Sequence, residues 1–394
     1  MGFVMNYIKR GVVGGVMLIG AFSVSYVHHV HAASGIDTQA REAILFDTAT
    51  GTVLLDKNAD QSMPPASMSK IMTVYLLFES LKEGRVSLDD TFRVSENAWR
   101  KGGAASGSST MFLPPNSEVR VEDLILGIIV QSGNDACIVV AENLAGSEEA
   151  FARQMTEKAR EIGMANSTFA NSTGWPDPGQ RMTARDLAIL ADKIVTAFPK
   201  YYHYYSVKEF TYNGIRQTNR NPLIYGFPGA DGLKTGHTQE AGYGLTATAK
   251  RDDQRLVLVV NGLPSKKSRA TESARLLDWA FREFGNYSLF KTGEVVDIAP
   301  TWLGTDPTVE MKINQDVLLT MSKKSRRNMK VSVRYQSPIA APIVAGQEVG
   351  KLVIEAPNFK TVEVPLMAGN GVEQLGLFGR LGAALEFLLW GEST

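Results

Sequence analysis

The segment Met68–Glu79 sets the strongest limit on the fold, because its apolar side chains are spread around the whole circumference of a helix. Such a helix is stable in water only when other elements cover it on every side. The chain must therefore build a body large enough to enclose a helix. Its 394 residues, of which 44% are hydrophobic, supply that body and are long enough for two domains.

The rest of the first 290 residues predicts strands on both sides of a helical middle. Strands at the two ends of a segment come together as an antiparallel sheet on which the helices pack, so we expect an α+β domain over 33–290. The expected elements are a hairpin over 41–56, helices over 121–145 and 184–197, strands over 244–249 and 256–260, and a helix over 274–284.

The pattern changes near residue 291. Short β-branched or alternating runs at 331–335, 351–355 and 361–364 are separated by Gly and Pro, which predicts a small all-β domain over 291–368. This domain contains the basic run Lys323–Arg327. We interpret the run as a solvated turn, with attraction to anionic lipid headgroups as the alternative.

Residues 1–32 have the pattern of a secretory signal peptide. Lys9 and Arg10 precede an uncharged apolar stretch over 11–27, and Val30-His31-Ala32 offers small residues for cleavage after Ala32. A retained membrane helix is the rival interpretation. Export through this signal would place the mature chain outside the cytoplasm.

Residues 369–394 predict an amphipathic helix, because apolar residues recur there at three- and four-residue steps. The apolar part is shorter than the ~20 residues that span a bilayer. We expect the helix to lie on a membrane surface, with docking onto the protein's own body as the alternative. The recurring residues are Leu375, Phe378, Leu381, Leu385, Leu388 and Leu389, and Trp390 follows them.

Ser67-Met68-Ser69-Lys70 combines a nucleophile and a base at the start of the buried helix. Pro64 and Pro65 precede it, and prolines are favoured at the first helical turn. Residues three apart share a helix face, so Lys70 is expected beside Ser67. Apolar surroundings lower the pKa of a lysine, and a neutral lysine can take the serine proton.

Two further motifs carry groups that suit a cleft. Ser132-Gly133-Asn134 follows an apolar run and ends or interrupts a buried helix, so its serine can relay a proton and its asparagine can hold a substrate amide. Lys234-Thr235-Gly236 directly precedes a strand that starts near Gly242. An edge strand there can pair with an extended peptide, while the lysine supplies positive charge and the glycine allows close backbone approach.

The spacing of each motif occurs a second time in the chain, but the residues around the second copies do not suit an active site. Ser288-Leu289-Phe290-Lys291 does not open an apolar helix, and its lysine would also have to begin Lys291-Thr292-Gly293. Ser95-Glu96-Asn97 puts an acid where a neutral cleft is wanted. We therefore interpret only the first set as functional.

Composition and residue types disfavour several other classes of protein. The formal net charge is zero, which gives a nucleic-acid partner no electrostatic support. Cys137 lies in an apolar run without a base or a cation, so we expect a buried small side chain and not a reactive thiol. Once the signal is removed, the histidines are His203, in an aromatic run that suggests packing, and His237. A Ser-His-Asp triad is therefore disfavoured, and we expect no metal site and no cofactor.

The order Ser-x-x-Lys, Ser-x-Asn, Lys-Thr-Gly matches the trio of penicillin-binding proteins and class A β-lactamases. Together with the surrounding residues 132–137, 210–213, 219–221 and 231–238, it makes the chain resemble the low-molecular-mass penicillin-binding D-alanyl-D-alanine carboxypeptidases, serine peptidase family S11. The resemblance covers 37–367, and the amphipathic tail is similar to the family's anchor.

The resemblance implies a β-lactamase/transpeptidase-like catalytic domain and roles for the motif residues. Ser67 would be the acylated nucleophile and Lys70 its general base. Ser132, Asn134 and Lys234 would complete the proton and substrate network.

The same resemblance implies the substrate-binding residues. Thr235 and Gly236 belong to the strand motif beside the substrate, and the backbone N–H groups of Ser67 and His237 would form an oxyanion hole. Arg269 stands where the family places an arginine that meets the terminal carboxylate of the substrate, a task that suits a bidentate guanidinium. An ordinary surface arginine is the alternative for Arg269.

The implied activity is removal of the terminal D-alanine from peptidoglycan stem peptides that end in D-Ala-D-Ala, with β-lactam antibiotics as inhibitors. The enzyme would act in the periplasm, at the outer face of the cytoplasmic membrane, with the all-β domain as a spacer. A D,D-endopeptidase that cuts cross-links uses identical chemistry, but the family's endopeptidases generally lack the C-terminal domain.

Two more distant alternatives are a β-lactamase and an inactive peptidoglycan-binding scaffold. Class A β-lactamases use a glutamate to activate the deacylating water, and residues 167–180, where that loop is expected, contain no Glu or Lys. A scaffold has no need of the complete set of motif residues. We therefore expect the carboxypeptidase.

Overall fold

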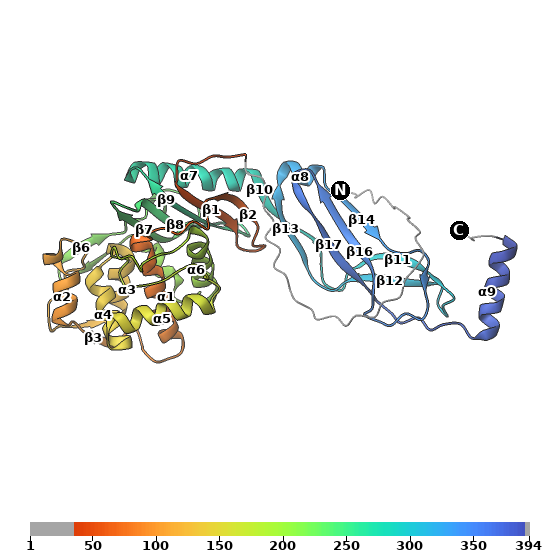
Figure 1. Ribbon diagram of the computed structural model, residues 1–394, viewed down its shortest axis with the longest axis horizontal. Helices are drawn as coiled ribbons and strands as arrows, with labels where there is room; N and C mark the ends of the chain where they lie inside the picture. Colours follow the sequence, from red (N-terminus) through yellow and green to blue (C-terminus); the bar gives the residue numbers. More distant parts are fainter. Residues whose placement is uncertain (1–34, 391–394) are drawn as a thin grey trace. The chain divides into compact units, whose positions relative to one another are not determined.

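The computed structural model describes residues 35–390 (Figure 1). The predicted signal peptide over 1–32 lies outside the described residues. The chain divides into two compact units between Arg282 and Glu283, and each is described by itself.

The first unit is built on a five-stranded antiparallel sheet in the order β2-β1-β9-β8-β7. The predicted hairpin and the two later strands are present. Strand β8 starts at Gly242 as expected, but it lies inside the sheet between β9 and β7 and is not the edge strand. Strand β7 lies at the edge of the sheet and pairs along its length with β8. The whole Lys234–Gly236 motif lies within β7. The strands are β1 (Glu42–Asp47), β2 (Val53–Lys57), β7 (Ala230–Thr238), β8 (Gly242–Arg251) and β9 (Gln254–Leu263).

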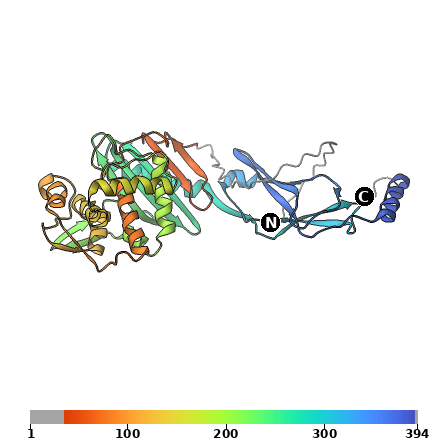
Figure 2. The same cartoon turned by 60° about the horizontal axis from the view of Figure 1, so that its bottom comes forward.

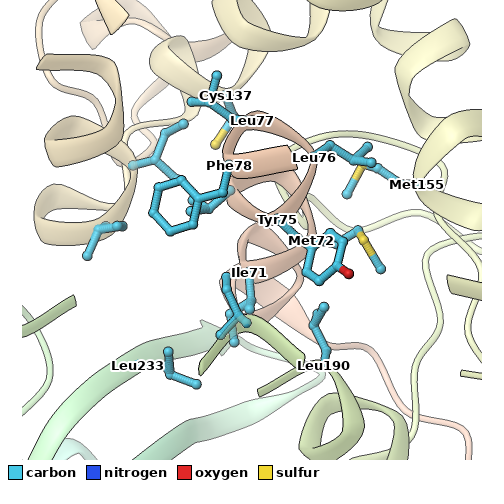
Figure 3. Close-up of a cluster of buried hydrophobic side chains, with 14 of the residues drawn as sticks. Ile71, Met72, Tyr75, Leu76, Leu77, Phe78, Cys137, Met155, Leu190 and Leu233 are labelled. Carbon is cyan, nitrogen blue, oxygen red and sulfur yellow. The ribbon is translucent and has the colours of Figure 1, made fainter. Parts of the chain in front are cut away.

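Helix α1 (Lys70–Lys82) is enclosed on every side, which confirms the prediction from its composition. A short 3-10 turn, η1 (Ala66–Ser69), leads into it. Eleven of the thirteen residues of α1 are buried. In Figure 3 the side chains of α1 are surrounded by Cys137, Met155, Leu190 and Leu233, which come from four different elements. Burial of each large apolar side chain stabilises the fold by roughly 1.5–3 kcal/mol, so the packing around α1 contributes a large part of the stability of this unit.

The predicted helical region over 121–145 is interrupted. Helix α3 (Val121–Leu126) passes into a π-helical turn, η3 (Gly127–Gln131), and α4 (Asn134–Ala145) starts after a break. The break lies at Ser132, whose φ of 67° is in the left-handed region, and at Gly133. The Ser132–Asn134 motif therefore interrupts a buried helix, as its sequence suggested.

The other long helices cover the two faces of the sheet. Figure 1 shows α7 (Lys266–Glu283) along one face, while α6 and the other helices lie on the opposite face. Helix α6 (Ala184–Ala197) has the predicted bounds. Helix α7 begins eight residues before the predicted start at 274, because the Ser265 hydroxyl accepts a hydrogen bond from the Ser268 amide and caps the first turn.

The remaining elements of the first unit are short or lie beside the helical layer. They are α2 (Glu96–Gly102), α5 (Glu148–Glu161), the strand pairs β3 (Thr91–Arg93) with β4 (Glu118–Arg120) and β5 (Glu209–Tyr212) with β6 (Ile215–Thr218), and the 3-10 turns over Ala104–Ser106, Tyr202–Ser206 and Leu223–Tyr225.

The second unit has two sheets around one apolar core (Figure 2). Strand β10, which precedes the expected change of pattern at 291, pairs with β13. The six-stranded sheet has the order β14-β16-β17-β12-β11-β15, in which only β11 and β15 are parallel. The strands are β10 (Phe284–Phe290), β11 (Val295–Trp302), β12 (Thr308–Ile313), β13 (Val317–Ser322), β14 (Lys330–Arg334), β15 (Ile339–Ala340), β16 (Glu348–Ala356) and β17 (Phe359–Ala368).

The basic run in this unit forms a short helix, α8 (Lys323–Arg327), where a turn was predicted. The Ser322 hydroxyl accepts a hydrogen bond from the Ser325 amide, and this cap is what converts the turn into a helix.

The tail contains the predicted helix as α9 (Leu377–Trp390). Leu375, which the spacing included in the helix, precedes it, because its amide donates to the carbonyl of Leu303 in the body of the unit. Phe378 and Leu381 are exposed on α9. Within residues 35–390, every helix is too short or too polar to cross a bilayer.

Candidate active site

Ser67 and Lys70 form a close pair at the start of the buried helix. Ser67 lies on the turn η1 and is half-buried, and the preceding Ala66 has a left-handed φ of 49°. Lys70 is 1% exposed, and its Nζ lies 2.9 Å from Ser67 Oγ. Burial lowers the pKa of Lys70 from its usual value to about 8, so a neutral amine is accessible near physiological pH. A hydroxyl beside such an amine can be activated as a nucleophile.

The second hydrogen-bond partner of Lys70 comes from the loop 171–175. Lys70 Nζ donates to the carbonyl oxygen of Thr173. Asn171 Oδ1 holds this loop by accepting hydrogen bonds from the amides of Thr173, Gly174 and Trp175. The sequence drew notice to 167–180 only for its lack of Glu and Lys, although the Asn-Ser-Thr-Gly composition of this loop is typical of a tight turn.

A glutamate from helix α5 fastens the same loop. Glu148 Oε1 accepts hydrogen bonds from both the amide and the hydroxyl of Ser172, and the Thr73 hydroxyl of α1 donates to the Ser172 carbonyl. The loop passes so close to the nucleophile turn that a Cβ on Gly174 would lie 2.0 Å from the Ala66 carbonyl oxygen. The position of Lys70 therefore depends on residues about a hundred positions along the chain.

Ser132 and Asn134 lie where the helical region is interrupted, and both are buried. Among the described residues, Ser132 Oγ has no hydrogen-bond partner. The carboxylate of Asp135 keeps this break in place, since it accepts hydrogen bonds from the Thr110 hydroxyl and from the amides of Met111 and Leu113. Asp135 is a structural member of the site that spacing alone did not single out.

Lys234 and Thr235 are buried on the edge strand β7. Burial, together with the charge of Lys70, holds the pKa of Lys234 well below its ordinary value. The Lys234 ammonium group donates to the carbonyl oxygen of Thr235 at 3.2 Å. The two lysines of the motifs thus share one desolvated region.

Gly236 has a different contact from the one expected. A Cβ at this position would lie 2.8 Å from the Pro65 carbonyl oxygen and 3.3 Å from the Ala66 Cβ. The glycine therefore lets strand β7 approach the turn that carries Ser67, in addition to any approach of a substrate.

His237 and Arg269 meet around one tyrosine ring. The exposed imidazole of His237 stacks on Tyr243 with ring centroids 3.9 Å apart. The guanidinium of Arg269, on the first turn of α7, lies 5.8 Å from the centroid of the same ring. Arg269 is 7% exposed, and its Nε has no partner among the described residues. Burial lowers the pKa of Arg269 to about 10.

Arg220 is a further cation near these residues, and its spacing in the sequence gave no sign of this position. Its Nη1 donates to Ser109 Oγ at 2.6 Å, and the Ser109 carbonyl accepts from the Asn134 amide at 2.7 Å. Burial lowers the pKa of Arg220, and its charge contributes to the lowered pKa of Lys70 and of Lys234. Arg220 and Arg269 thus supply cations near the motif residues, which suits an anionic substrate.

The second copies of the motif spacings, at 288–293 and 95–97, have other roles. Ser288 lies on β10 of the second unit, and the exposed Lys291 forms an ion pair with Asp316 at 3.0 Å. Ser95 caps helix α2 by accepting from the Ala98 amide. Cys137 is fully buried, and burial raises the pKa of its thiol to about 12, which agrees with the expected unreactive side chain.

Comparison with known proteins identifies the family. The D-alanyl-D-alanine carboxypeptidase family, peptidase S11, matches residues 28–265, and the C-terminal domain of penicillin-binding protein 5 matches residues 284–374. The chain belongs to the peptidase S11 family. The D-alanyl-D-alanine carboxypeptidase DacC of Escherichia coli is 38% identical over 376 residues, which cover 94% of each chain.

Solved structures of penicillin-binding proteins are similar in fold. Penicillin-binding protein 5 of Haemophilus influenzae matches with a TM-score of 0.74 and 34% identity, over 87% of this chain and 100% of that one. Penicillin-binding protein D2 of Listeria monocytogenes in its ampicillin-bound form matches with a TM-score of 0.55 and 27% identity, over 63% and 99% of the two chains. The mixed α/β unit thus corresponds to the peptidase S11 match, and the all-β unit corresponds to the match with the C-terminal domain of penicillin-binding protein 5.

Proposed function

We propose that this protein is a serine-type D-alanyl-D-alanine carboxypeptidase that removes the terminal D-alanine from peptidoglycan stem peptides through an acyl-enzyme. The observation that carries the proposal is the 2.9 Å contact between Lys70 Nζ and Ser67 Oγ, in which the lysine is buried and has a lowered pKa. Relatives named D-alanyl-D-alanine carboxypeptidase match nearly the whole of this chain and nearly the whole of their own length, so the proposal covers the complete protein.

Acylation begins when neutral Lys70 takes the proton of the Ser67 hydroxyl. Ser67 Oγ then attacks the carbonyl carbon of the penultimate D-alanine, and a tetrahedral oxyanion forms. The backbone N–H groups of Ser67 and of His237 are the donors that would stabilise this oxyanion. One such donor typically lowers the barrier by about 3 kcal/mol.

The intermediate collapses when the C–N bond to the terminal D-alanine breaks. The leaving amine needs a proton, which Lys70 now holds. Ser132 Oγ, buried and without a partner among the described residues, is suited to relay that proton. An ester between the peptide and Ser67 remains, and attack of water on its carbonyl releases the shortened peptide and returns the proton to Ser67.

Substrate binding relies on cations and on the edge strand. Arg269 has an unpartnered guanidinium nitrogen and no acidic neighbour in contact among the described residues, so it is suited to bind the terminal carboxylate, together with the charge of Lys234. An extended peptide can add to the free edge of β7 beside Thr235 and Gly236, and the Asn134 side chain can hold a substrate amide.

Acylation by β-lactams follows from the same geometry, since the serine attacks a carbonyl carbon and displaces a ring nitrogen. The Listeria relative has been solved with ampicillin bound. Efficient β-lactam hydrolysis is not favoured, because the loop 171–175 contains no acid that could activate the deacylating water. Glu148 contacts this loop, but its carboxylate accepts hydrogen bonds from Ser172. The C-terminal domain favours carboxypeptidase over endopeptidase activity.

The location that we propose is the periplasmic face of the cytoplasmic membrane. The signal pattern over 1–32 would export the chain, and α9 would lie in the membrane interface. Phe378 and Leu381 are exposed on α9, and exposed apolar side chains on one amphipathic helix are typical of interfacial binding.

The decisive experiment incubates the purified protein with a diacyl-Lys-D-Ala-D-Ala peptide and quantifies released D-alanine. A steady release that is lost in Ser67→Ala supports the proposal. Release of no D-alanine by the wild type, while benzylpenicillin is hydrolysed rapidly, would identify a β-lactamase instead.

A further inference from the structure

The second unit carries a concentrated positive charge that the proposed chemistry does not use. Residues 317–347 contain six Lys and Arg residues and no Asp or Glu. Five of the six lie within eight positions, four on α8 and one just after it. We call this surface the basic tip, and it consists of Lys323, Lys324, Arg326, Arg327 and Lys330.

Most of these charges have no acidic partner. Lys323, Lys324, Arg327 and Lys330 are exposed, and none of the four is in an ion pair among the residues that the structure describes. Arg326 is different, since its guanidinium lies 5.4 Å from the ring centroid of Tyr287. Like charges this close repel one another, so an anionic partner that binds this surface would relieve the repulsion.

The backbone under the basic tip is held in place. The Ser322 hydroxyl caps α8 at the Ser325 amide, and Ser325 Oγ donates to the carbonyl of Pro357 in the turn between β16 and β17, at 2.8 Å. The cations therefore project from a fixed helix and not from a flexible loop, which lowers the entropy lost on binding.

The basic tip and the tail lie at opposite ends of the second unit. Strand β17 starts at Phe359, beside the Pro357 turn and α8, and runs ten residues to Ala368. Beyond that end, Gln374 bridges to Gly304 and the Leu375 amide bonds to Leu303, just before α9. Ten residues of strand extend about 33 Å. The end that carries the basic tip is also where the chain enters the unit, since Phe284 pairs with Ser322, the residue before α8.

This separation disfavours the lipid partner considered from the sequence. If α9 lies in the membrane interface, the basic tip is about 30 Å from the origin of the tail along β17. Electrostatic attraction to a lipid surface decays over a Debye length of about 8 Å at physiological ionic strength. An anionic partner away from the membrane surface therefore fits the basic tip better than lipid does.

We propose that the basic tip binds the carboxylate groups of peptidoglycan stem peptides, as a second contact with the polymer outside the active site. This inference rests on the proposed function, which makes peptidoglycan the substrate and α9 the membrane contact. Each stem peptide carries carboxylates, and stems repeat along a glycan strand, so several lysine and arginine side chains can engage one strand at once. Contacts that are weak one by one become effective when they are linked in this way.

The test measures co-sedimentation of the full mature protein with purified peptidoglycan sacculi, with the active site first blocked by benzylpenicillin. The variant is Lys323→Ser/Lys324→Ser/Arg327→Ser. The matched control is Lys101→Ser/Arg153→Ser/Lys193→Ser, which removes three exposed cations from α2, α5 and α6 of the first unit. A third variant, Lys323→Arg/Lys324→Arg, keeps the charge.

We expect the serine variant at the basic tip to bind sacculi about tenfold more weakly at low salt, roughly a factor of two for each exposed ion pair lost. The control and the arginine variant should bind as the wild type does, and high salt should abolish the difference. D-alanine release from a small soluble peptide should be unchanged in all variants.

Equal sacculus binding by the wild type and the basic-tip variant would overturn the proposal. So would an equal loss in the control variant, or a loss of binding to vesicles containing anionic lipid without a loss on sacculi, which would identify lipid as the partner. Failure of the proposed function itself is separable, because it would appear as absent benzylpenicillin acylation before any sacculi are added.

Discussion

The Nζ of Lys70 contacts the Oγ of Ser67 at 2.9 Å and also donates a hydrogen bond to the carbonyl oxygen of Thr173. The neutral amine can keep the second bond while its lone pair accepts the proton of Ser67. The carbonyl therefore orients the lysine without neutralising it, because a backbone oxygen carries no full charge. Burial, and not a neighbouring acid, then sets the pKa of the base.

Covalent acylation should occur at Ser67 alone. Ser67→Ala should lower D-alanine release by about a thousandfold or more, since it removes the nucleophile. Mass spectrometry after benzylpenicillin treatment should place one adduct on the peptide that contains Ser67. Ser288→Ala is the matched control, because its Ser-x-x-Lys spacing lies on a strand of the second unit and should have no role in acylation. An adduct that survives in Ser67→Ala would refute the assignment.

The acylation rate should depend on the protonation of Lys70. With a pKa of about 8 the amine is mostly protonated at lower pH, so the rate should rise about tenfold per pH unit below 8 and level off above it. The measurement is the second-order rate constant of acylation by benzylpenicillin across this range. Glu148 raises the pKa of Lys70, so Glu148→Gln should move the rise to lower pH. A flat profile from pH 6 to 9 would exclude Lys70 as the base.

Gly236→Ala should damage both stability and activity. The added Cβ would lie 2.8 Å from the Pro65 carbonyl oxygen, so strand β7 and the Ser67 turn must separate. Overpacking of this kind typically costs about 1–3 kcal/mol, measurable by urea denaturation, and should lower the acylation rate as well. Gly376→Ala is the control, because a Cβ there meets no atom within 4 Å. Wild-type stability in Gly236→Ala would contradict the close contact.

Arg269 should matter only for substrates with a free terminal carboxylate. Arg269→Ala should reduce kcat/KM on D-Ala-D-Ala peptides by about 10–100-fold, as expected for loss of a charged hydrogen-bonding pair of roughly 1.5–3 kcal/mol. The same peptides amidated at the C-terminus serve as the control and should show little further loss. An equal reduction on both would mean that Arg269 supports the structure around Tyr243 and does not bind substrate.

Membrane attachment should depend on α9 and not on the residues before it. Residues 372–375 pair with the body of the second unit, so truncation after Gly376 is cleaner than truncation within that segment. The truncated protein should move to the soluble periplasmic fraction with its activity on soluble peptides retained. Phe378→Glu/Leu381→Glu, at two exposed positions, should do the same. Continued sedimentation of both variants with membranes would place the anchor elsewhere.

Local features of the site could be predicted because they depend on nearby residues. The three-residue spacing of Ser67 and Lys70 determines a shared helix face, and the charge-free sequence around them determines burial. The break at Ser132 followed from a motif that interrupts an apolar run. The alternation beyond residue 291 predicted an all-β unit, which the structure confirms.

Other features depend on backbone hydrogen bonds that the apolar spacing does not report, one of them local and one between distant segments. The start of α7 at Lys266 depended on a cap at Ser265 that the apolar spacing does not report. Leu375 has helical spacing, yet its amide is taken by Leu303, seventy-two positions earlier in the chain. Periodicity describes which face a residue would occupy, but it does not say which backbone partner a residue will find.

The sequence by itself thus determined the three motifs, the buried helix and the two kinds of domain, because spacing and apolar pattern act over a few residues. Only the tertiary structure decided that Thr173 and Glu148 position Lys70, that Lys234–Gly236 lies on the edge strand against Pro65, and that the basic tip and the tail lie at opposite ends of their unit. These relationships join residues far apart along the chain. Such contacts stabilise the protein only after the intervening loops have closed. A local sequence pattern therefore does not predict them.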